Sequence, residues 1–339
     1  MRKSAFLLLL LLFTVASAQE KGICYYGVGF YNLENLFDTI HDAGKNDYEF
    51  LPDGKYKWGT LKYTNKLKNM AKVLGDMGTD VSATGMALVG VSEVENSRVL
   101  KDLVVQEPLA KRKWGFLHVE SNDQRGVDCA VLYNPALFKP VTTKLVPYVA
   151  EYGDTVFYGR GFLVVSGYMG GEMVYAIVSH WPSRYSKSPV RERVGRQVRQ
   201  LKDSLMNANP CAKVIVMGDM NDNPDNKSLS VSLGAVREAA HLKRNSDLYN
   251  PWWNILRNEG RGTHEYNDKW SLFDQIILSA GMVGPSAQGL KFHKAEIFSR
   301  NYLFQEKGRY KGRMKRTHAG GIWLNGYSDH LPVIVYLMK

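Results

Sequence analysis

Acidic, amide and histidine side chains follow several apolar segments of this sequence, at points where strands are expected to end. The stretch GDMNDNP at 218–224 comes directly after the run KVIVM, so Asp219 and Asn221 enter a turn that Pro224 closes. Turn formation alone explains any one such group, whereas several that converge from different strand ends form a site. Three other apolar runs end in polar groups: Asn32 and Glu34, then Glu93, Glu95 and Asn96, then His180 and Arg184. Asp274 lies near the start of a further apolar run, and Asp329 and His330 come just before the last one.

These residue types favour metal-assisted chemistry at a phosphate. Glu93, Asp329 and Asn32 carry the hard oxygen ligands that Mg²⁺, Mn²⁺ or Ca²⁺ prefer. Asp219 is a candidate base for an attacking water, and Asn221 is a candidate group for orienting water or phosphate. Histidines paired with carboxylates are held protonated, and cationic side chains stabilise a phosphoryl group that gains negative charge in the transition state.

Several other classes of enzyme lack support in the sequence. No GxxxxGK[ST] phosphate loop is present, which argues against a nucleotide triphosphatase of that type. No GxSxG elbow is present, which argues against an α/β-hydrolase. The three cysteines, Cys24, Cys129 and Cys211, show no zinc spacing and no disulfide framework, and their apolar neighbours favour buried thiols.

Short apolar strands alternate with a few helices along the whole chain. Helical periodicity over 64–77 predicts one helix, and Ser188 followed by Pro189 predicts the start of another, with Ser188 as its N-cap. The basic residues of that second helix, Arg191, Arg193, Arg196, Arg199 and Lys202, are expected on a solvated face. Strands are predicted at 25–32, 87–94, 128–134, 162–169, 173–181, 213–221, 272–279 and 332–338. The pattern predicts one α+β or α/β domain with sheet packed on sheet.

The first residues predict export. Arg2 and Lys3 precede an apolar run at 5–13, and Ala16-Ser17-Ala18 is a small-residue cleavage site, so 1–18 is predicted to be a signal peptide. No other stretch is long and apolar enough to span a bilayer. We therefore expect a periplasmic or secreted protein without a stable membrane anchor. We expect a monomer, and the sequence predicts no protein partner.

The composition is that of a globular and basic protein. Hydrophobic residues make up 45% and charged residues 23% of the chain, which argues against disorder. The formal net charge is +11, and removal of Arg2 and Lys3 leaves +9. Such a charge favours polyanionic partners, including nucleic acid, and it is equally consistent with an excess of lysine that keeps an exported protein in solution.

Seven motifs occur in a fixed order from one end of the mature chain to the other. They are the asparagine of FYNLENLFD, then EVEN, RGVDCAVLY, SHWPSR, GDMNDNP, FDQIILS and SDH. With this set the sequence resembles the endonuclease/exonuclease/phosphatase superfamily, the deoxyribonuclease I-like proteins, and in particular a bacterial exported subgroup. The resemblance implies a four-layer α/β sandwich at 19–339, in which two mixed β-sheets pack face to face with helices outside.

The resemblance also implies a role for each motif residue. Glu93 matches the principal metal ligand, with Asn32 and Asp329 at or near the metal, which is expected to be Mg²⁺ or else Mn²⁺ or Ca²⁺. Asp219 matches the base and Asn221 its partner on the phosphate. The remaining matches are His330 as the terminal catalytic histidine, Asp274 as the carboxylate that orients it, His180 as a contact to the scissile phosphate, Asp128 as the acid that pairs with His180, and Arg125 and Arg184 as phosphate contacts. Glu34 is expected to lie behind these groups.

The sequence leaves the substrate open. The expected activity is phosphoester hydrolysis, most simply by a phosphodiesterase that acts as a nuclease. The alternatives are a phospholipid- or inositol-phosphate-directed enzyme of the sphingomyelinase type, and a binding module without catalysis. Two segments are expected to set specificity: 41–62, which is rich in Tyr, and 300–318, where Tyr302, Phe304 and Tyr310 lie among seven basic residues suited to phosphate tracking and base stacking.

Overall fold

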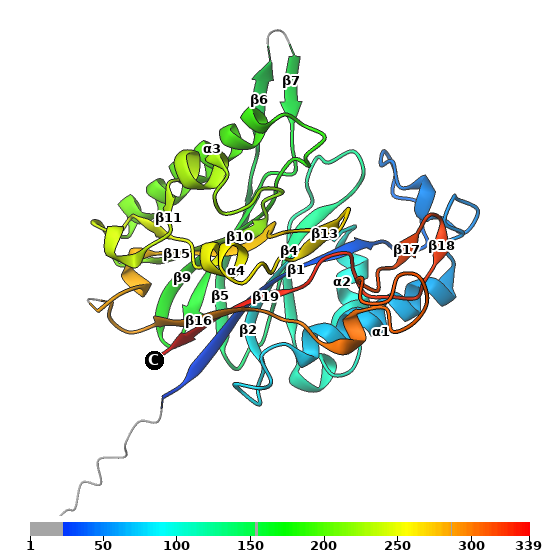
Figure 1. Cartoon of the computed structure of the whole chain (residues 1–339), viewed down its shortest axis with the longest axis horizontal. Helices are drawn as coiled ribbons and strands as arrows, with labels where there is room; N and C mark the ends of the chain where they lie inside the picture. Colours follow the sequence, from blue (N-terminus) through cyan, green and yellow to red (C-terminus); the bar gives the residue numbers. More distant parts are fainter. Residues whose placement is uncertain (1–22, 153–154, 286) are drawn as a thin grey trace, which may run out of the picture.

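The computed structural model describes residues 23–339 except 153–154 and 286, so the signal peptide predicted at 1–18 lies outside the described residues. Two large mixed β-sheets pack face to face, and helices cover their outer faces (Figure 1). This is the four-layer sandwich that the sequence predicts. Within the described residues, no helix has the length and apolar character needed to cross a membrane.

The first sheet has six strands, and its centre is the long first strand of the chain. That strand pairs antiparallel with the last strand and parallel with the second, so the first and last strands of the described chain are neighbours in the middle of one sheet. In spatial order the strands are β16 (Lys291–Ile297), β19 (Val333–Met338), β1 (Tyr25–Leu36), β2 (Met86–Val94), β4 (Asp128–Tyr133) and β3 (Gly115–His118).

The second sheet has seven strands and supplies the other half of the core. In spatial order they are β11 (Ala235–Val236), β12 (Leu248–Tyr249), β15 (Asp274–Ser279), β10 (Lys213–Asp219), β9 (Glu172–His180), β8 (Phe162–Met169) and β5 (Phe138–Val146). Gly90 of β2 faces this sheet, and a Cβ there would lie 2.7 Å from Met217 Sδ. The two sheets therefore approach closely where their central strands cross.

The helices bury one face each against the outer sides of the sheets. Val194, Val198 and Met206 of α3 pack with Ile177 and Val214 of the second sheet. The helices are α1 (Thr60–Asp76), α2 (Ser97–Val104), α3 (Ser188–Ala208) and α4 (Trp252–Arg257), with short 3-10 turns at η1 (Tyr48–Phe50), η2 (Ala110–Arg112), η4 (Ala239–His241), η5 (Ala280–Met282) and η6 (Asn301–Leu303) and a π-helical turn at η3 (Ser228–Leu233). Both predicted helices are confirmed, although Lys187, not Ser188, is the N-cap of α3.

Three small hairpins extend from the sandwich. They are β6–β7 (Val149–Tyr152 and Thr155–Tyr158), β13–β14 (His264–Tyr266 and Lys269–Ser271) and β17–β18 (His318–Ala319 and Ile322–Trp323). Figure 1 shows β17 and β18 beside the blue segment that follows β1, so that two segments distant in sequence meet at one end of the molecule.

Two expectations about solvent exposure are wrong. Arg191 and Lys202 of α3 are buried, because Arg191 pairs with Asp222 at 2.8 Å and Lys202 donates to Ser246 O. The basic residues of this helix therefore do not all form a solvated face. Cys24 and Cys211 are exposed, since one precedes β1 and the other lies in the turn before β10, whereas Cys129 is buried.

Candidate active site

A cavity of about 310 Å³ opens at the edge of the sandwich where strands of both sheets end. Its lining includes carboxylates, histidines and arginines from six separate segments. Six of the predicted site residues line it, namely Glu93, Arg125, His180, Asp219, Asn221 and His330. The convergence of strand ends inferred from the sequence is therefore found in the structure.

Three site residues lie side by side on neighbouring strands of the second sheet. Asp219 at the end of β10 is in register with His180 of β9 and with Asp274 of β15. Gly218 makes this register possible, because a Cβ at that position would overlap the backbone oxygen of Ser179 on β9. Strand pairing alone thus sets the relative positions of these three side chains.

His330 lies between the two carboxylates of this row. Its Nδ1 is 2.7 Å from Asp274 Oδ2, and its Nε2 is 3.8 Å from Asp219 Oδ2. Burial lowers the pKa of His330, but the carboxylates of Asp274 and Asp219 outweigh burial and raise that pKa well above its usual value. The imidazole is therefore protonated at neutral pH, with Asp274 in the orienting position that the sequence predicts.

Asp219 is buried and carries the features of a general base. Burial raises its pKa to about 7, against the opposing effect of the His330 cation. Its Oδ1 accepts the backbone N–H of Asn221 at 2.9 Å, and Asn221 Nδ2 donates to Trp181 O at 3.0 Å. A carboxylate with this pKa can take a proton from water near neutral pH.

Glu93 faces the cavity because the backbone of β2 is irregular at its end. The pairing of β2 with β4 shifts register between Ser92 and Val94, and Glu93 adopts a left-handed φ of 60°. A bulge of this kind re-aims a side chain out of the regular alternation of the strand. Glu34, Asn35 and Asn221 also have positive φ, so unfavourable backbone conformations are concentrated around this site.

Asn32 has a different contact from the one expected. Its Oδ1 accepts the backbone N–H of Glu34 at 2.9 Å, which fixes the orientation of the amide. Its Nδ2 consequently faces Asp219 Oδ2 at 3.1 Å and Glu93 Oε1 at 3.5 Å. Its assignment at or near the metal stays a prediction, because Nδ2 faces both carboxylates while Oδ1 accepts one hydrogen bond and keeps a second lone pair.

Asp329 is held by an arginine that the sequence placed in the basic segment 300–318. Arg316 Nη2 donates to Asp329 Oδ2 at 2.7 Å, and its Nε donates to Glu34 Oε1 at 2.9 Å. Burial raises the pKa of Asp329, but the Arg316 guanidinium and the His330 cation lower it below its usual value. Behind this pair the buried Lys66 donates to Thr317 Oγ1 at 2.7 Å.

The residues at this edge fit a hard divalent cation. Glu93 Oε2 accepts the N–H of Asn35 at 2.9 Å, while its Oε1 has only the long contact to Asn32 and lies on the cavity. Asp329 is a second ionised carboxylate, next to His330 in the chain, and it lines a separate hollow. Mg²⁺ takes one or two protein carboxylates and keeps several waters, which this donor set can supply.

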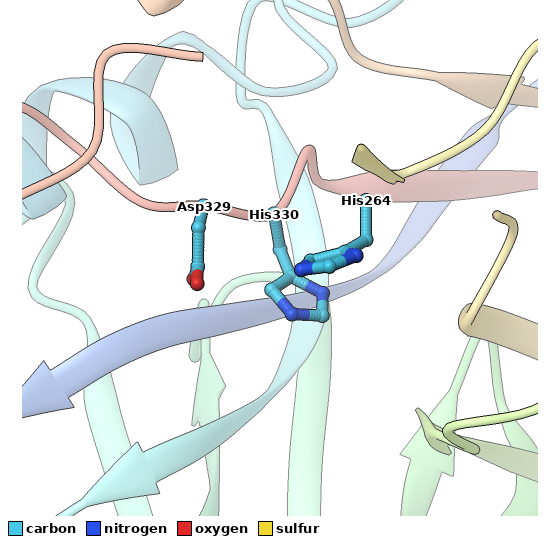
Figure 2. Close-up of side chains that lie close together, drawn as sticks. All are labelled: His264, Asp329 and His330. Carbon is cyan, nitrogen blue, oxygen red and sulfur yellow. The ribbon is translucent and has the colours of Figure 1, made fainter. Parts of the chain in front are cut away.

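Two tighter clusters of acidic and histidine side chains are not suited to bind a divalent cation. One joins Asp219 and Asp274 to His330, and the other joins His264 and Asp329 to the same histidine. Figure 2 shows the His264 and His330 rings next to each other, with centroids 4.8 Å apart, and Asp329 preceding His330 in the chain. Since His330 is protonated and committed to Asp274, it is not available as a metal ligand in either cluster.

His180 differs from His330 in its charge. Its Nε2 is 3.6 Å from Asp219 Oδ2, but burial, followed by the charges of Arg160 and His330, lowers its pKa well below the usual value. We expected both histidines to be held protonated by carboxylates, and for His180 that expectation is wrong. Its Nδ1 is buried and has no hydrogen-bond partner among the described residues.

The predicted pairing of Asp128 with His180 is also wrong. Asp128 Oδ2 lies 2.9 Å from Nε2 of His118, and its Oδ1 accepts the N–H of Ser121. His118 of β3 is in register with Ala130 of β4, two residues from Asp128, and both His118 and Asp128 are almost completely buried. Asp128 therefore belongs to a buried ion-pair contact of the first sheet and does not line the cavity.

Of the two arginines that the sequence predicts as phosphate contacts, Arg125 lines the cavity and Arg184 does not. A third arginine, Arg160, lines the cavity and was not predicted. Arg125 lines the cavity and donates to Asn35 Oδ1 at 2.8 Å. Arg184 lies behind the cavity wall, where it donates to Asn221 O and packs on the Phe273 ring. Arg160 lines the cavity, with its Nε 3.1 Å from Asp123 Oδ2. The only sequence signal for Arg160 is its position between two glycines just before β8.

His264 was also missed, since a histidine in a short hairpin carries no signal in sequence. It stacks on Phe273 and lies against His330, and burial lowers its pKa to about 4. In the segment 300–318, Tyr302 donates to Asp76 and Phe304 packs against the core, so neither is the stacking surface we expected. Tyr310 is exposed.

The comparison with known proteins agrees with this architecture. A family model described as the Endonuclease/Exonuclease/phosphatase family matches residues 27–339. No curated protein sequence matches the chain. An endonuclease/exonuclease/phosphatase family protein from Bacteroides thetaiotaomicron is 16% identical, with a TM-score of 0.56 over 93% of this chain and 98% of that one.

Two further solved structures share the fold. The Bacteroides thetaiotaomicron mannosyl-6-phosphatase Bt3783 is 16% identical, with a TM-score of 0.55 over 92% of this chain and 99% of that one. D. rerio TDP2 complexed with single strand DNA product is 14% identical, with a TM-score of 0.51 over 92% of this chain and 98% of that one. At these identities the likeness is one of fold, while the family follows from the sequence model.

Proposed function

This chain belongs to the endonuclease/exonuclease/phosphatase family and is a phosphoric ester hydrolase, and we propose that it is a divalent-metal-dependent phosphodiesterase that cleaves nucleic acid. The observation that carries the proposal is a basic hollow of about 300 Å³ that begins at Asp329, next to the catalytic cavity. The catalytic cavity takes the scissile phosphate, so a further cationic hollow suits a substrate with several phosphates in a row.

The basic hollow contains positive side chains that are not neutralised by ion pairs between described residues. Lys307 and Arg309 line it and make no ion pair within the part of the chain that the structure describes. Arg313 also lines it, but its charge is offset by Glu265 and Asp268. Arg309 lies over the exposed Tyr310 ring, with 5.8 Å between guanidinium and ring centroid. The D. rerio TDP2 structure with a single-strand DNA product supports the same reading for a protein of this fold.

The proposed mechanism divides the work between the two ends of the cavity. Glu93 would hold a divalent cation, which when bound would supply positive charge that stabilises the transition state. Asp219 accepts the proton of the attacking water, and Asn32 Nδ2 holds the Asp219 carboxylate in place at 3.1 Å. Asn221, tied to Trp181 O, keeps the turn that bears Asp219 rigid.

Four cationic or donor side chains face the phosphate from the other side. His330 is protonated and donates from Nε2, because Asp274 holds its Nδ1–H. His180 is neutral and donates from one ring nitrogen without adding charge. Arg125 and Arg160 neutralise the oxygens that gain charge as the water attacks.

A substrate panel with a metal titration tests the proposal. Single-stranded DNA, plasmid DNA, RNA, sphingomyelin vesicles, inositol phosphates and mannose 6-phosphate would each be incubated with Mg²⁺, Mn²⁺ or Ca²⁺. We expect cleavage of nucleic acid that chelation abolishes and that raised salt weakens. Turnover of lipid or sugar phosphate with intact nucleic acid would contradict the proposal.

A second candidate is a phosphomonoesterase that acts on a phosphorylated sugar. The cavity of about 310 Å³ with two arginines is large enough for a terminal phosphate, and Bt3783, with the same fold, is described as a mannosyl-6-phosphatase. The panel separates the two candidates, because release of inorganic phosphate from mannose 6-phosphate marks this second activity.

Export completes the proposal. The sequence at 1–18 supports a signal peptide cleaved after Ala18. Expression of the full chain followed by N-terminal sequencing of the mature protein tests this, and we expect Gln19 as the first residue. A mature protein that retains Arg2 and Lys3 would contradict it.

A further inference from the structure

We propose that a hollow on the far side of Asn35 from the catalytic cavity is a stacking site for a nucleobase next to the scissile phosphate, so that the enzyme selects single-stranded substrates. The hollow measures about 360 Å³, and Phe50, Lys55, Tyr56 and His318 are among its lining residues. This inference rests on the proposed function, because it names which form of nucleic acid the same site takes.

Asn35 places the hollow directly beside the reacting centre. Its side chain lines the hollow, while its backbone N–H donates to Glu93 Oε2 at 2.9 Å and its Oδ1 accepts from Arg125 at 2.8 Å. Glu93 and Arg125 line the catalytic cavity. A substrate whose phosphate lies between them therefore has its neighbouring residue within reach of the hollow.

One wall of the hollow is aromatic and comes from two segments distant in sequence. Tyr56 follows η1, and His318 begins the β17–β18 hairpin, which Figure 1 shows beside that segment. The Tyr56 and His318 ring centroids are 4.7 Å apart, and Phe50 lies 5.1 Å from Tyr56. Trp58 is buried behind them and supports His318 at 5.7 Å. The wall is thus a row of contacting, mutually tilted rings on a packed base, with Lys55 Nζ 5.0 Å from the Tyr56 centroid.

The polar groups of the hollow suit a base with phosphates on either side. Nε2 of His318 is buried and has no hydrogen-bond partner among the described residues. Burial, with the charges of Lys62 and Lys66, lowers the pKa of His318 to about 4, so the ring is neutral and can stack on a base. Lys55 and Arg316 also line the hollow as cations for a flanking phosphate, and each is partly neutralised, Lys55 by Glu49 and Arg316 by Glu34 and Asp329.

Stacking on this wall requires a base that has left its helix. Bases in a duplex are already stacked and paired, and unstacking one costs a few kcal/mol, whereas single strands offer their rings freely. The hollow therefore favours single-stranded over double-stranded nucleic acid, and it does so without reading a sequence, because every base has a π-face.

An abasic scan tests the inference on the protein itself. Single-stranded octamers with one tetrahydrofuran abasic position, moved along the strand, would be bound in Mg²⁺ to an Asp219→Asn protein that does not cleave them. We expect one position at which the loss of the base weakens binding about 5- to 100-fold, the range that stacking on an aromatic side chain gives. Equal binding of all the abasic octamers would overturn the inference. The experiment leaves every residue of the hollow unchanged.

Substitution of Tyr56 tests whether the base at the sensitive position lies in the hollow. Adding Tyr56→Ala to Asp219→Asn is expected to weaken binding of the intact octamer by the same factor, and to have no further effect on the octamer abasic at the sensitive position. Tyr56→Phe keeps the ring and should bind like the parent. Tyr168→Ala, which removes an exposed tyrosine of β8, is the matched control and should also bind like the parent. Equal losses for every octamer would overturn the assignment.

The possible outcomes distinguish failure of the stacking site from failure of the proposed nuclease function. Wild-type protein that cleaves nucleic acid but shows a flat abasic scan, or cleaves duplex as fast as single strands, refutes the stacking site alone. Wild-type protein that hydrolyses another phosphoester and leaves every nucleic acid intact refutes the proposed function.

Discussion

Asp219 and Asp274 lie directly opposite each other on the paired strands β10 and β15, and one imidazole, that of His330, serves both. Two buried carboxylates at this spacing would repel each other if both were ionised without a cation between them. The protonated His330 is that cation. The base, the acid and the group that orients the acid are thus a single electrostatic unit whose spacing is set by β-sheet register.

Asp274→Asn should uncouple this unit. The substitution keeps the shape and removes the charge that most raises the pKa of His330, so that histidine loses its proton more easily. We expect kcat to fall by about 10²-fold or more, as for the loss of a general acid, while KM changes little. The control is Asp268→Asn, an exposed carboxylate paired only with Arg313. Equal kcat values for the two variants would contradict the assignment.

The pH profile should rise through the titration of Asp219. Burial holds its pKa at about 7, and only the ionised carboxylate accepts a proton from water, so kcat/KM is expected to increase as the pH rises through about 7. A bound cation favours the ionised form, so the midpoint should move to lower pH as the Mg²⁺ concentration is raised. Rates measured from pH 5 to 9 at two Mg²⁺ concentrations check both statements, and a rate independent of pH would contradict them.

Glu93→Gln should impair metal use without unfolding the protein. Glutamine can still accept the N–H of Asn35, but it lacks the negative charge that attracts the cation. We expect the metal concentration for half-maximal activity to rise at least about tenfold, with an unchanged melting temperature. Glu95→Gln is the matched control, because burial raises the pKa of Glu95 to about 8 and its Oε2 accepts from Asp38 away from the cavity. An identical metal response in both variants would argue against Glu93 as the ligand.

Gly218→Ala should destabilise the sheet on which the catalytic row is built. A methyl group there overlaps Ser179 O on β9, and only a separation of the two strands relieves the overlap. We expect a loss of about 1–3 kcal/mol in the free energy of unfolding, the usual cost of overpacking. Gly281→Ala, where a Cβ meets no atom within 4 Å, is the control. Chemical denaturation of both variants measures the difference.

Local sequence pattern was enough to find the strands and the residues at their ends. The runs before Asp219 and His180 are apolar and β-branched, and such segments become central strands wherever a core forms around them. The first and last strands, β1 and β19, were likewise readable from their apolar residues. The fold class and the meeting of six site residues at one cavity followed from these elements and from the ordered motifs.

Side-chain partners could not be read in the same way. Asp128 precedes Cys129 in a strand, and whether it reaches His180 or His118 depends on which neighbour lies on the same face of the sheet. The orientation of the Asn32 amide is set by the backbone N–H of Glu34, a contact that the sequence pattern does not reveal. Arg160 and His264 lie in connections whose paths are set by packing, so composition and spacing gave no reason to single them out.

The positive φ angles of Glu34, Asn35, Glu93 and Asn221 have an evolutionary consequence. Each such residue strains the chain by about 1 kcal/mol or more, and glycine at the same place would remove most of that burden. A laboratory selection that rewards thermal tolerance alone should therefore favour glycine first at Glu93, whose side chain makes one short hydrogen bond, and yield a sturdier protein that no longer turns over substrate. Residues whose backbone strain lowers thermal stability thus lie at the candidate active site.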